Sequence, residues 1–216
     1  TKVDFKELHN LCFISKKEIY NSTYQEKGKT KHLLDKFSTR LGKIDEMPFI
    51  GYVGTNYSNH STQIVFVSRA EIDSTNEDDE LYANLYESFM QFKNSASNLE
   101  SAYRQYADSY KEHILNSSCS SYLNHFFKET DLTIDDVAFV NAVPFKCLDN
   151  PSKKLYKPSI KDFTSRFFNI VQADWIQPFG LNDVQRISFE SNYVPYQIAS
   201  GLSITNNAIS SQNQCS

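Results

Sequence analysis

Residues 63–68, QIVFVS, and residues 135–141, DDVAFVN, are the two stretches that decide the fold. Each holds a short, continuous apolar run with β-branched residues, and each is bordered by a polar or acidic segment. Runs of this kind are typical of strands buried on both faces, as in a parallel sheet. Residues 185–189, QRISF, predict a third strand. These three stretches therefore predict the core of one sheet.

Helical patterns precede and separate these strands. The first forty residues read as helical, because apolar residues recur near the 3.6-residue period. Residues 80–129 predict two or three helices, on which a tyrosine stripe favours a packed helix face over a base-stacking platform. Residues 158–177 predict an amphipathic helix that Pro178 ends.

Strands that alternate with long helices imply right-handed crossovers. We therefore expect an α/β fold, a three-layer sandwich with a mostly parallel central sheet and helices on both faces. The length of 216 residues fits a single domain over residues 1–216. Residues 80–129 are expected to be a helical insertion, and residues 200–216, rich in Ser, Asn and Gln, a weakly ordered tail.

Charge is unevenly distributed along the chain. Lys and Arg number 22 and Asp and Glu number 26, a net charge of −4 that disfavours indiscriminate nucleic-acid binding. Residues 16–43 nevertheless carry eight basic against three acidic residues, and residues 146–161 carry five against one. The two basic segments could form one surface for an anionic partner, although ordinary solvated faces give the same pattern.

Several classes of function lose their sequence signatures. The four cysteines and five histidines are scattered without metal-ligand spacing, so no metal site is expected. Dinucleotide, P-loop and α/β-hydrolase motifs are absent, and we expect no cofactor. No run approaches 18 apolar residues and the start has no signal-peptide core, which favours a reduced, intracellular, cytoplasmic protein with no membrane contact.

The loops that follow the first two strands are the places to look for a site, because ligands of open α/β sheets bind at the carboxyl ends of strands. In this order the loops resemble the uracil-DNA glycosylase superfamily. Residues 139–146, FVNAVPFK, look like that family's second strand motif, an apolar triplet ending in Asn and followed by Ala-Val. Residues 51–57, GYVGTNY, followed by the strand at 64–67, are similar to the approach to its first motif. The similarity covers roughly residues 48–190.

The resemblance implies a DNA glycosylase-like hydrolase of DNA repair, which recognises a flipped uracil or modified pyrimidine and hydrolyses its N-glycosidic bond. Two family features are missing. The first turn, residues 68–71, has neither the family's Gly nor its Pro, and a direct alignment puts Ala70 where the family often has a catalytic acid. The family's His-Pro-Ser loop has no counterpart, because no histidine follows His125.

The candidate site follows from these loops. Glu71 and Asp73 are the only carboxylates directly after the first strand and are the catalytic candidates for holding water. Asn141 is the candidate for base recognition, because a carboxamide can pair with the imide edge of a pyrimidine. The remaining candidates are Ser68, Arg69 and Phe145 for the substrate, and Lys146, Lys153, Lys154 and Lys157 for DNA phosphates.

Two other interpretations stay open. The same fold with a degenerate active site would bind nucleic acid or a nucleotide without cleaving it. An unrelated α/β enzyme or interaction protein would use Asn141 only to cap the turn after its strand. For the partners, the sequence indicates DNA and a protein that binds the 80–129 insertion.

Overall fold

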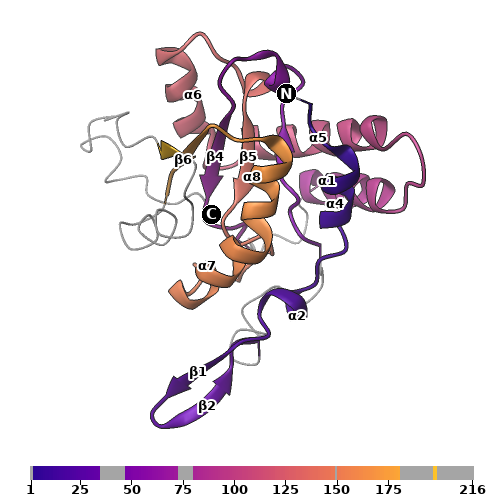
Figure 1. Cartoon of the computed structure of the whole chain (residues 1–216). Coiled ribbons are helices and arrows are strands. Elements are labelled where there is room, and N and C mark those ends of the chain that lie inside the picture. The colour runs from indigo at the N-terminus through magenta and orange to yellow at the C-terminus, as the bar shows by residue number, and fades with distance from the viewer. Residues whose placement is uncertain (1, 35–46, 73–79, 149, 181–196, 199–216) are drawn as a thin grey trace.

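A computed structural model describes residues 2–34, 47–72, 80–148, 150–180 and 197–198, and Figure 1 shows their arrangement. The predicted strand at 185–189 and the predicted tail at 200–216 lie outside the described residues. The elements in chain order are α1 (Phe5–Leu11), α2 (Lys16–Ile19), β1 (Thr23–Glu26), β2 (Lys29–His32), β3 (Tyr52–Val53), the 3₁₀ turn η1 (Tyr57–Asn59), β4 (Ile64–Ser68), α4 (Glu80–Lys93), α5 (Leu99–Asn116), α6 (Ser120–Glu129), the 3₁₀ turn η2 (Ile134–Asp136), β5 (Ala138–Asn141), α7 (Lys153–Ser159), the π-helical turn η3 (Ile160–Thr164), α8 (Ser165–Val171), β6 (Trp175–Pro178) and β7 (Gln197–Ile198).

The main sheet has the strand order β3-β5-β4-β6-β7. Strand β4 pairs in parallel with β5 and β6, and β6 pairs in parallel with β7, whereas β3 is antiparallel to β5 at the edge. The register of β4 on β5 ends with Ser68 opposite Asn141. A mixed α/β fold is therefore present, and both apolar runs that the sequence assigned to strands form neighbouring central strands. The acidic residues before the second run form η2 rather than the start of the strand.

One face of β4 and β5 packs against α5 and α6. The ring of Phe66 on β4 lies 4.8 Å from that of Phe126 on α6, measured between centroids. The ring of Phe139 on β5 lies 6.0 Å from that of Tyr110 on α5. Alternate side chains of a strand share a face, so Ser68 and Asn141 point to the same side as these rings. The fold thus directs two polar strand ends toward α5.

The three helices at residues 80–129 confirm the predicted helical segment. Their buried residues belong to the same hydrophobic core as the strands. The tyrosine stripe of α5 is a packed helix face, because Tyr103, Tyr106 and Tyr110 are at most 1% exposed. The hydroxyl of Tyr103 donates a hydrogen bond to the carbonyl oxygen of Gly51 at 3.0 Å. A protein partner for this segment stays a prediction.

The N-terminal region departs from the expected run of helices. After α1 and α2, strands β1 and β2 form an antiparallel hairpin that projects from the body of the molecule (Figure 1). Its two turn residues, Lys27 and Gly28, have φ of 51° and 73°, which is the two-residue loop that suits a twisted hairpin. Tyr24 is the only bulky apolar residue on these two strands, so hydropathy shows no alternation that would predict them.

The predicted helix at residues 158–177 is also corrected. Helix α7 begins earlier, at Lys153, and the chain continues through η3 into α8, which ends at Val171. Gln172 closes α8 in the left-handed conformation, with φ of 51°. Trp175–Pro178 is strand β6 instead of the end of a helix, and its first residue donates a backbone hydrogen bond to the carbonyl of Gln63. Pro178 therefore ends a strand.

The turn that leads into β5 is held by Asp136. Its carboxylate accepts hydrogen bonds from the backbone N–H and the hydroxyl of Thr133, at 2.8 and 2.7 Å, and contacts Nε2 of His60 at 2.8 Å. Burial alone would raise the pKa of Asp136, but these contacts outweigh it and lower the pKa to about 2.

Among the described residues, no helix is both long and apolar enough to cross a membrane.

Candidate functional site

The carboxyl ends of β4 and β5 form the point where the strand order reverses. The chain leaves β4 through α4, α5 and α6 to reach β5 on one side of it, and then returns through α7 and α8 to β6 on the other side. In open α/β sheets, ligands bind in the crevice at such a reversal, outside the carboxyl ends of the strands. The topology therefore marks the ends of β4 and β5 as the candidate site.

The two loops at this point are tied together by backbone hydrogen bonds. The N–H groups of Ala142, Val143 and Cys147 donate to the carbonyls of Ser68, Arg69 and Glu71, each at 2.8 Å. An isolated parallel bridge between Ile72 and Cys147 extends this pairing. The β4 loop is consequently held as firmly as a strand through Ile72, which fixes the backbone that carries Glu71.

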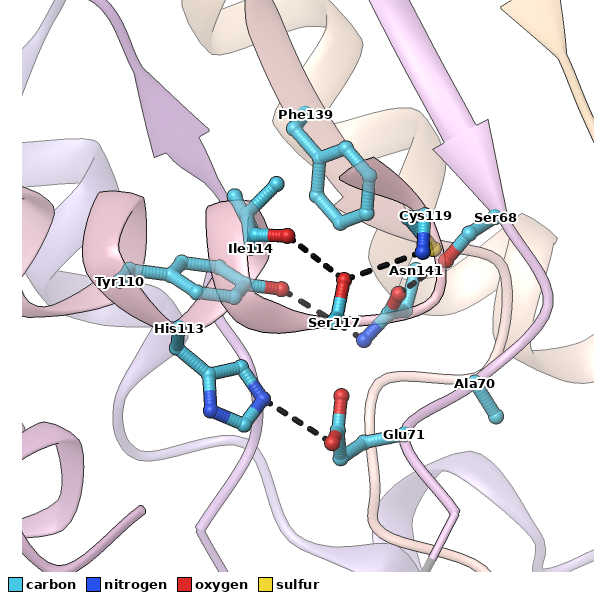
Figure 2. A pocket seen from close by; sticks show the side chains of 10 residues that line it. All are labelled: Ser68, Ala70, Glu71, Tyr110, His113, Ile114, Ser117, Cys119, Phe139 and Asn141. Atoms are coloured by element: carbon cyan, nitrogen blue, oxygen red, sulfur yellow. Dashed lines mark hydrogen bonds and ion pairs between the residues drawn. The ribbon is translucent and has the colours of Figure 1, made fainter. Parts of the chain in front are cut away.

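A small cavity lies between these loops and α5 (Figure 2). Its volume is about 10 Å³, which is room for one water molecule. The lining brings together three predicted site residues, from the ends of β4 and β5 and from the loop after β4: Ser68, Asn141 and Glu71. Helix α5 and the segment that follows it supply residues that the sequence did not single out for the site, namely Tyr110, His113, Ile114, Ser117 and Cys119.

The side chain of Asn141 is hydrogen-bonded at both ends of its amide. Oδ1 accepts from the hydroxyl of Ser68 at 2.5 Å, and Nδ2 donates to the hydroxyl of Tyr110 at a longer 3.5 Å. All three residues are at most 2% exposed. The amide is therefore fixed at both ends and links β4, β5 and α5.

Glu71 and His113 form the ionisable pair of the cavity. Oε1 of Glu71 lies 2.9 Å from Nε2 of His113, and the two side chains point toward each other from the β4 loop and from α5 (Figure 2). The imidazole is 7% exposed and the carboxylate 21% exposed. A partly exposed carboxylate beside room for one water is an arrangement that can hold and polarise that water.

The hydroxyl of Tyr110 accepts the hydrogen bond from the amide of Asn141 and lies within the electrostatic influence of the Glu71 carboxylate. Burial raises the pKa of its hydroxyl well above 10, and the negative charge of Glu71 raises it further. The hydroxyl therefore stays neutral at physiological pH. The sequence signal for this helix face was present, because Tyr110 and His113 are three residues apart and lie on one side of a helix. The sequence alone, however, could not predict that this face of α5 packs against the loop after β4.

Other predicted site residues lie elsewhere. Arg69 donates from Nη1 to the side chain of Asn150 at 3.0 Å and does not line the cavity. Phe145 is fully buried, with its ring 6.2 Å from that of Tyr20, and does not line the cavity either. Asp73 lies outside the described residues.

None of the four predicted phosphate-binding lysines lines the cavity. Lys146 lies over the ring of Tyr82, with Nζ 3.8 Å from the centroid. Lys154, on α7, lies at the same distance over the ring of Tyr24 in the hairpin. The two others, Lys153 and Lys157, are exposed on α7.

The described residues hold no cluster of three or more His, Cys, Asp or Glu that could bind a metal ion. Cys12 and Cys147 are buried and free, and burial raises the pKa of the Cys12 thiol to about 12. Cys119, beside the cavity, is disulfide-bonded, whereas the sequence favoured reduced cysteines.

No protein-family model matches the chain, and no protein of curated function matches it.

Proposed function

We propose that the chain is a DNA glycosylase-like hydrolase that recognises a flipped uracil or modified pyrimidine at the carboxyl ends of β4 and β5. The observation that carries the proposal is the convergence of Glu71 and Asn141. The sequence assigned these residues separate roles, and they lie about seventy positions apart in the chain, yet they line one cavity at the reversal of strand order. An Asn that only capped a turn would not need a carboxylate beside it.

We take the fold as a three-layer sandwich, in which α5 and α6 cover one face of the sheet and α7 and α8 cover the other. In support, Phe66 and Phe139 meet aromatic rings of α5 and α6, while Thr164 of η3 donates a hydrogen bond to the carbonyl oxygen of Ala142 just past β5. Right-handed crossovers in opposite directions across the sheet give the same arrangement.

In the proposed reaction, Glu71 holds the attacking water. The water oxygen forms a bond to the anomeric carbon of the sugar, and the electrons of the glycosidic bond leave with the base. The carboxylate accepts a proton from the water. The departing base anion then takes up that proton, which regenerates the carboxylate. His113 contacts Oε1 of Glu71 and so orients the carboxylate. Fixed donors at the base would stabilise its developing negative charge.

Base recognition by Asn141 requires the cavity to open. A cavity of about 10 Å³ holds a water and not a pyrimidine, and both ends of the amide are already bonded. A base would take over the bonds to Ser68 and Tyr110, each with a net value of about 0.5–1.5 kcal/mol. Extruding the base from DNA costs a few kcal/mol more. We therefore expect single-stranded substrates to be processed faster than duplexes.

A second candidate function keeps the fold without the chemistry. A chain that had lost the chemistry but kept the fold would bind a nucleobase or nucleotide without cleaving it. The observation in its favour is the turn at residues 68–71, which has neither the family's Gly nor its Pro.

Base release from oligonucleotides separates the two candidates. Single strands and duplexes carrying uracil or other modified pyrimidines are incubated with the full chain, and abasic sites are revealed by alkaline cleavage. The variant Glu71→Gln keeps the size of the side chain, and Glu129→Gln, at an exposed position on α6, is the matched control. Release that is lost only in Glu71→Gln supports the hydrolase. Binding without release supports the binder, and neither binding nor release refutes both.

A further inference from the structure

The β1–β2 hairpin presents two distinct faces. Residues directly opposite each other in an antiparallel pair share a face, and the register pairs Tyr24 with Lys31 and Glu26 with Lys29. These four side chains therefore lie on one side of the ribbon. The other side carries hydroxyl, amide and imidazole groups, with Thr23 opposite His32 and Gln25 opposite Thr30.

The first face turns toward α7. Nζ of Lys154 lies 3.8 Å from the centroid of the Tyr24 ring, a cation–π contact between α7 and the hairpin. The hairpin and α7 therefore form one continuous surface, although more than 120 residues separate them in the chain. Helix α7 follows the loop that leaves Asn141, so this surface is also connected to the candidate site.

This hairpin–α7 surface is strongly basic. Glu26 is its one acidic residue, and it pairs with Lys31 at 2.6 Å. Within the part of the chain that the structure describes, Lys27, Lys29, Lys153 and Lys157 make no ion pair. The surface is defined by six lysines against that single carboxylate, a net charge of +5 on a chain of net charge −4: Lys27, Lys29, Lys31, Lys153, Lys154 and Lys157.

The shape of the surface selects among anionic partners. An isolated two-stranded hairpin is marginally stable in water, and the one bulky apolar side chain on these strands, Tyr24, already packs against the core of this chain instead of facing a protein partner. The major groove of B-DNA, about 12 Å wide, accepts a two-stranded ribbon. Lysines that flank such a ribbon reach the phosphates on either side. Polar groups such as those of Gln25 and Thr30 suit base edges and not lipid.

We propose that the hairpin and α7 grip duplex DNA, with the ribbon in the major groove and the α7 lysines on the phosphate backbone. This inference rests on the proposed function only for the identity of the partner. The hairpin is absent from the stretch that resembles the glycosylase superfamily, so it is an added DNA-holding arm of this chain.

Binding of a fluorescent duplex to the full chain, measured by anisotropy from 50 to 300 mM salt, tests the arm separately from chemistry. The test variant is Lys27→Asn with Lys29→Gln, since Asn tolerates the positive φ of residue 27. The matched control is Lys2→Gln with Lys6→Gln, which removes the same charge from exposed positions at α1. Each lysine–phosphate contact contributes about 0.9 to the slope of log K against log salt.

We expect the slope to fall by about two units in the hairpin variant and to stay unchanged in the control. An equal effect of both variants, or no binding of duplex by the parent chain, overturns the inference. Equal affinity for polyglutamate and duplex also overturns it, as does a dimer that dissociates when the hairpin is changed. None of these outcomes decides base release, which the Glu71→Gln experiment measures on single strands.

Discussion

Replacement of Asn141 by Asp is expected to make the stability of the fold depend on pH. The new carboxyl group would stand where the side chain is 2% exposed, beside the carboxylate of Glu71. The protonated acid can keep both contacts of the amide, because its carbonyl oxygen accepts from the Ser68 hydroxyl and its O–H donates to the Tyr110 hydroxyl, so it replaces the amide at little cost. Ionisation is different, because burial and a neighbouring negative charge both raise the pKa of a carboxyl group.

Each unit by which the pKa of the new carboxyl is raised costs about 1.4 kcal/mol of stability once the group ionises. A raised pKa in the folded state means that the stability is intact below the unfolded value, near 3.9, and is lost as the pH rises toward the folded value. Raising the pKa by two to three units would therefore make Asn141→Asp about 3–4 kcal/mol less stable than the parent at pH 7. At pH 4 we expect near-equal stability.

Urea unfolding followed by circular dichroism between pH 4 and pH 8 measures this difference. The control is Asn124→Asp on α6, where the side chain is exposed and the change should lie within about 0.5 kcal/mol at every pH. If Asn141→Asp is as stable as the parent at pH 7, the amide is not the buried link between β4, β5 and α5. The same variant, assayed at pH 5, should also lose preference among pyrimidine bases.

Three further outcomes follow from the geometry. Gly51→Ala should cost about 2–4 kcal/mol in urea unfolding, because Gly51 has φ of 91° and a Cβ there would overlap the ring of Phe167. Asp136→Asn should be less stable than the parent at pH 7 and equal to it at pH 2 in thermal melts. Because the pKa of Asp136 is lower in the folded protein than its ordinary value of 3.8, the ionised carboxylate stabilises the fold at pH values above 3.8. This stabilisation is lost as the pH falls toward 2. Four lysines are replaced together by Gln: Lys146, Lys153, Lys154 and Lys157. The slope of log K against log salt for duplex binding should then fall by about three to four units, and an unchanged slope would remove their role as phosphate contacts.

The central strands could be predicted because their physics is local. A short, continuous apolar run with β-branched residues is typical of a strand that is covered on both faces. Parallel pairing then brings the ends of such strands to one edge, so the proximity of Glu71 and Asn141 could be foreseen. Strand β6 was missed because a helix precedes it closely and Pro178 reads as a helix stop. Only tertiary pairing with β4 decides the matter there.

The rest of the site depends on docking that no local pattern encodes. Tyr110 and His113 belong to a helix whose tyrosine stripe correctly predicted a packed face. Which side chains of that face meet the β4 loop is set by the depth and rotation at which α5 rests on the sheet. The hairpin was missed for a different reason, since Tyr24 is the only bulky apolar residue on its strands and one such residue gives no period in hydropathy. Its turn, Lys27-Gly28, was the only local signal.

On this proposal, the cavity between β4, β5 and α5 receives a nucleobase. Side-chain amide resonances report it most directly, because Asn141 has one NH₂ group whose signals can be assigned by their absence in Asn141→Asp. A ¹H–¹⁵N spectrum of the labelled chain is recorded during titration with a single-stranded oligonucleotide carrying uracil, and with the same strand carrying adenine in its place. We predict that the Asn141 NH₂ signals shift with the uracil strand and not with the adenine strand. Unchanged Asn141 signals at a concentration where other resonances show the uracil strand bound would contradict the claim.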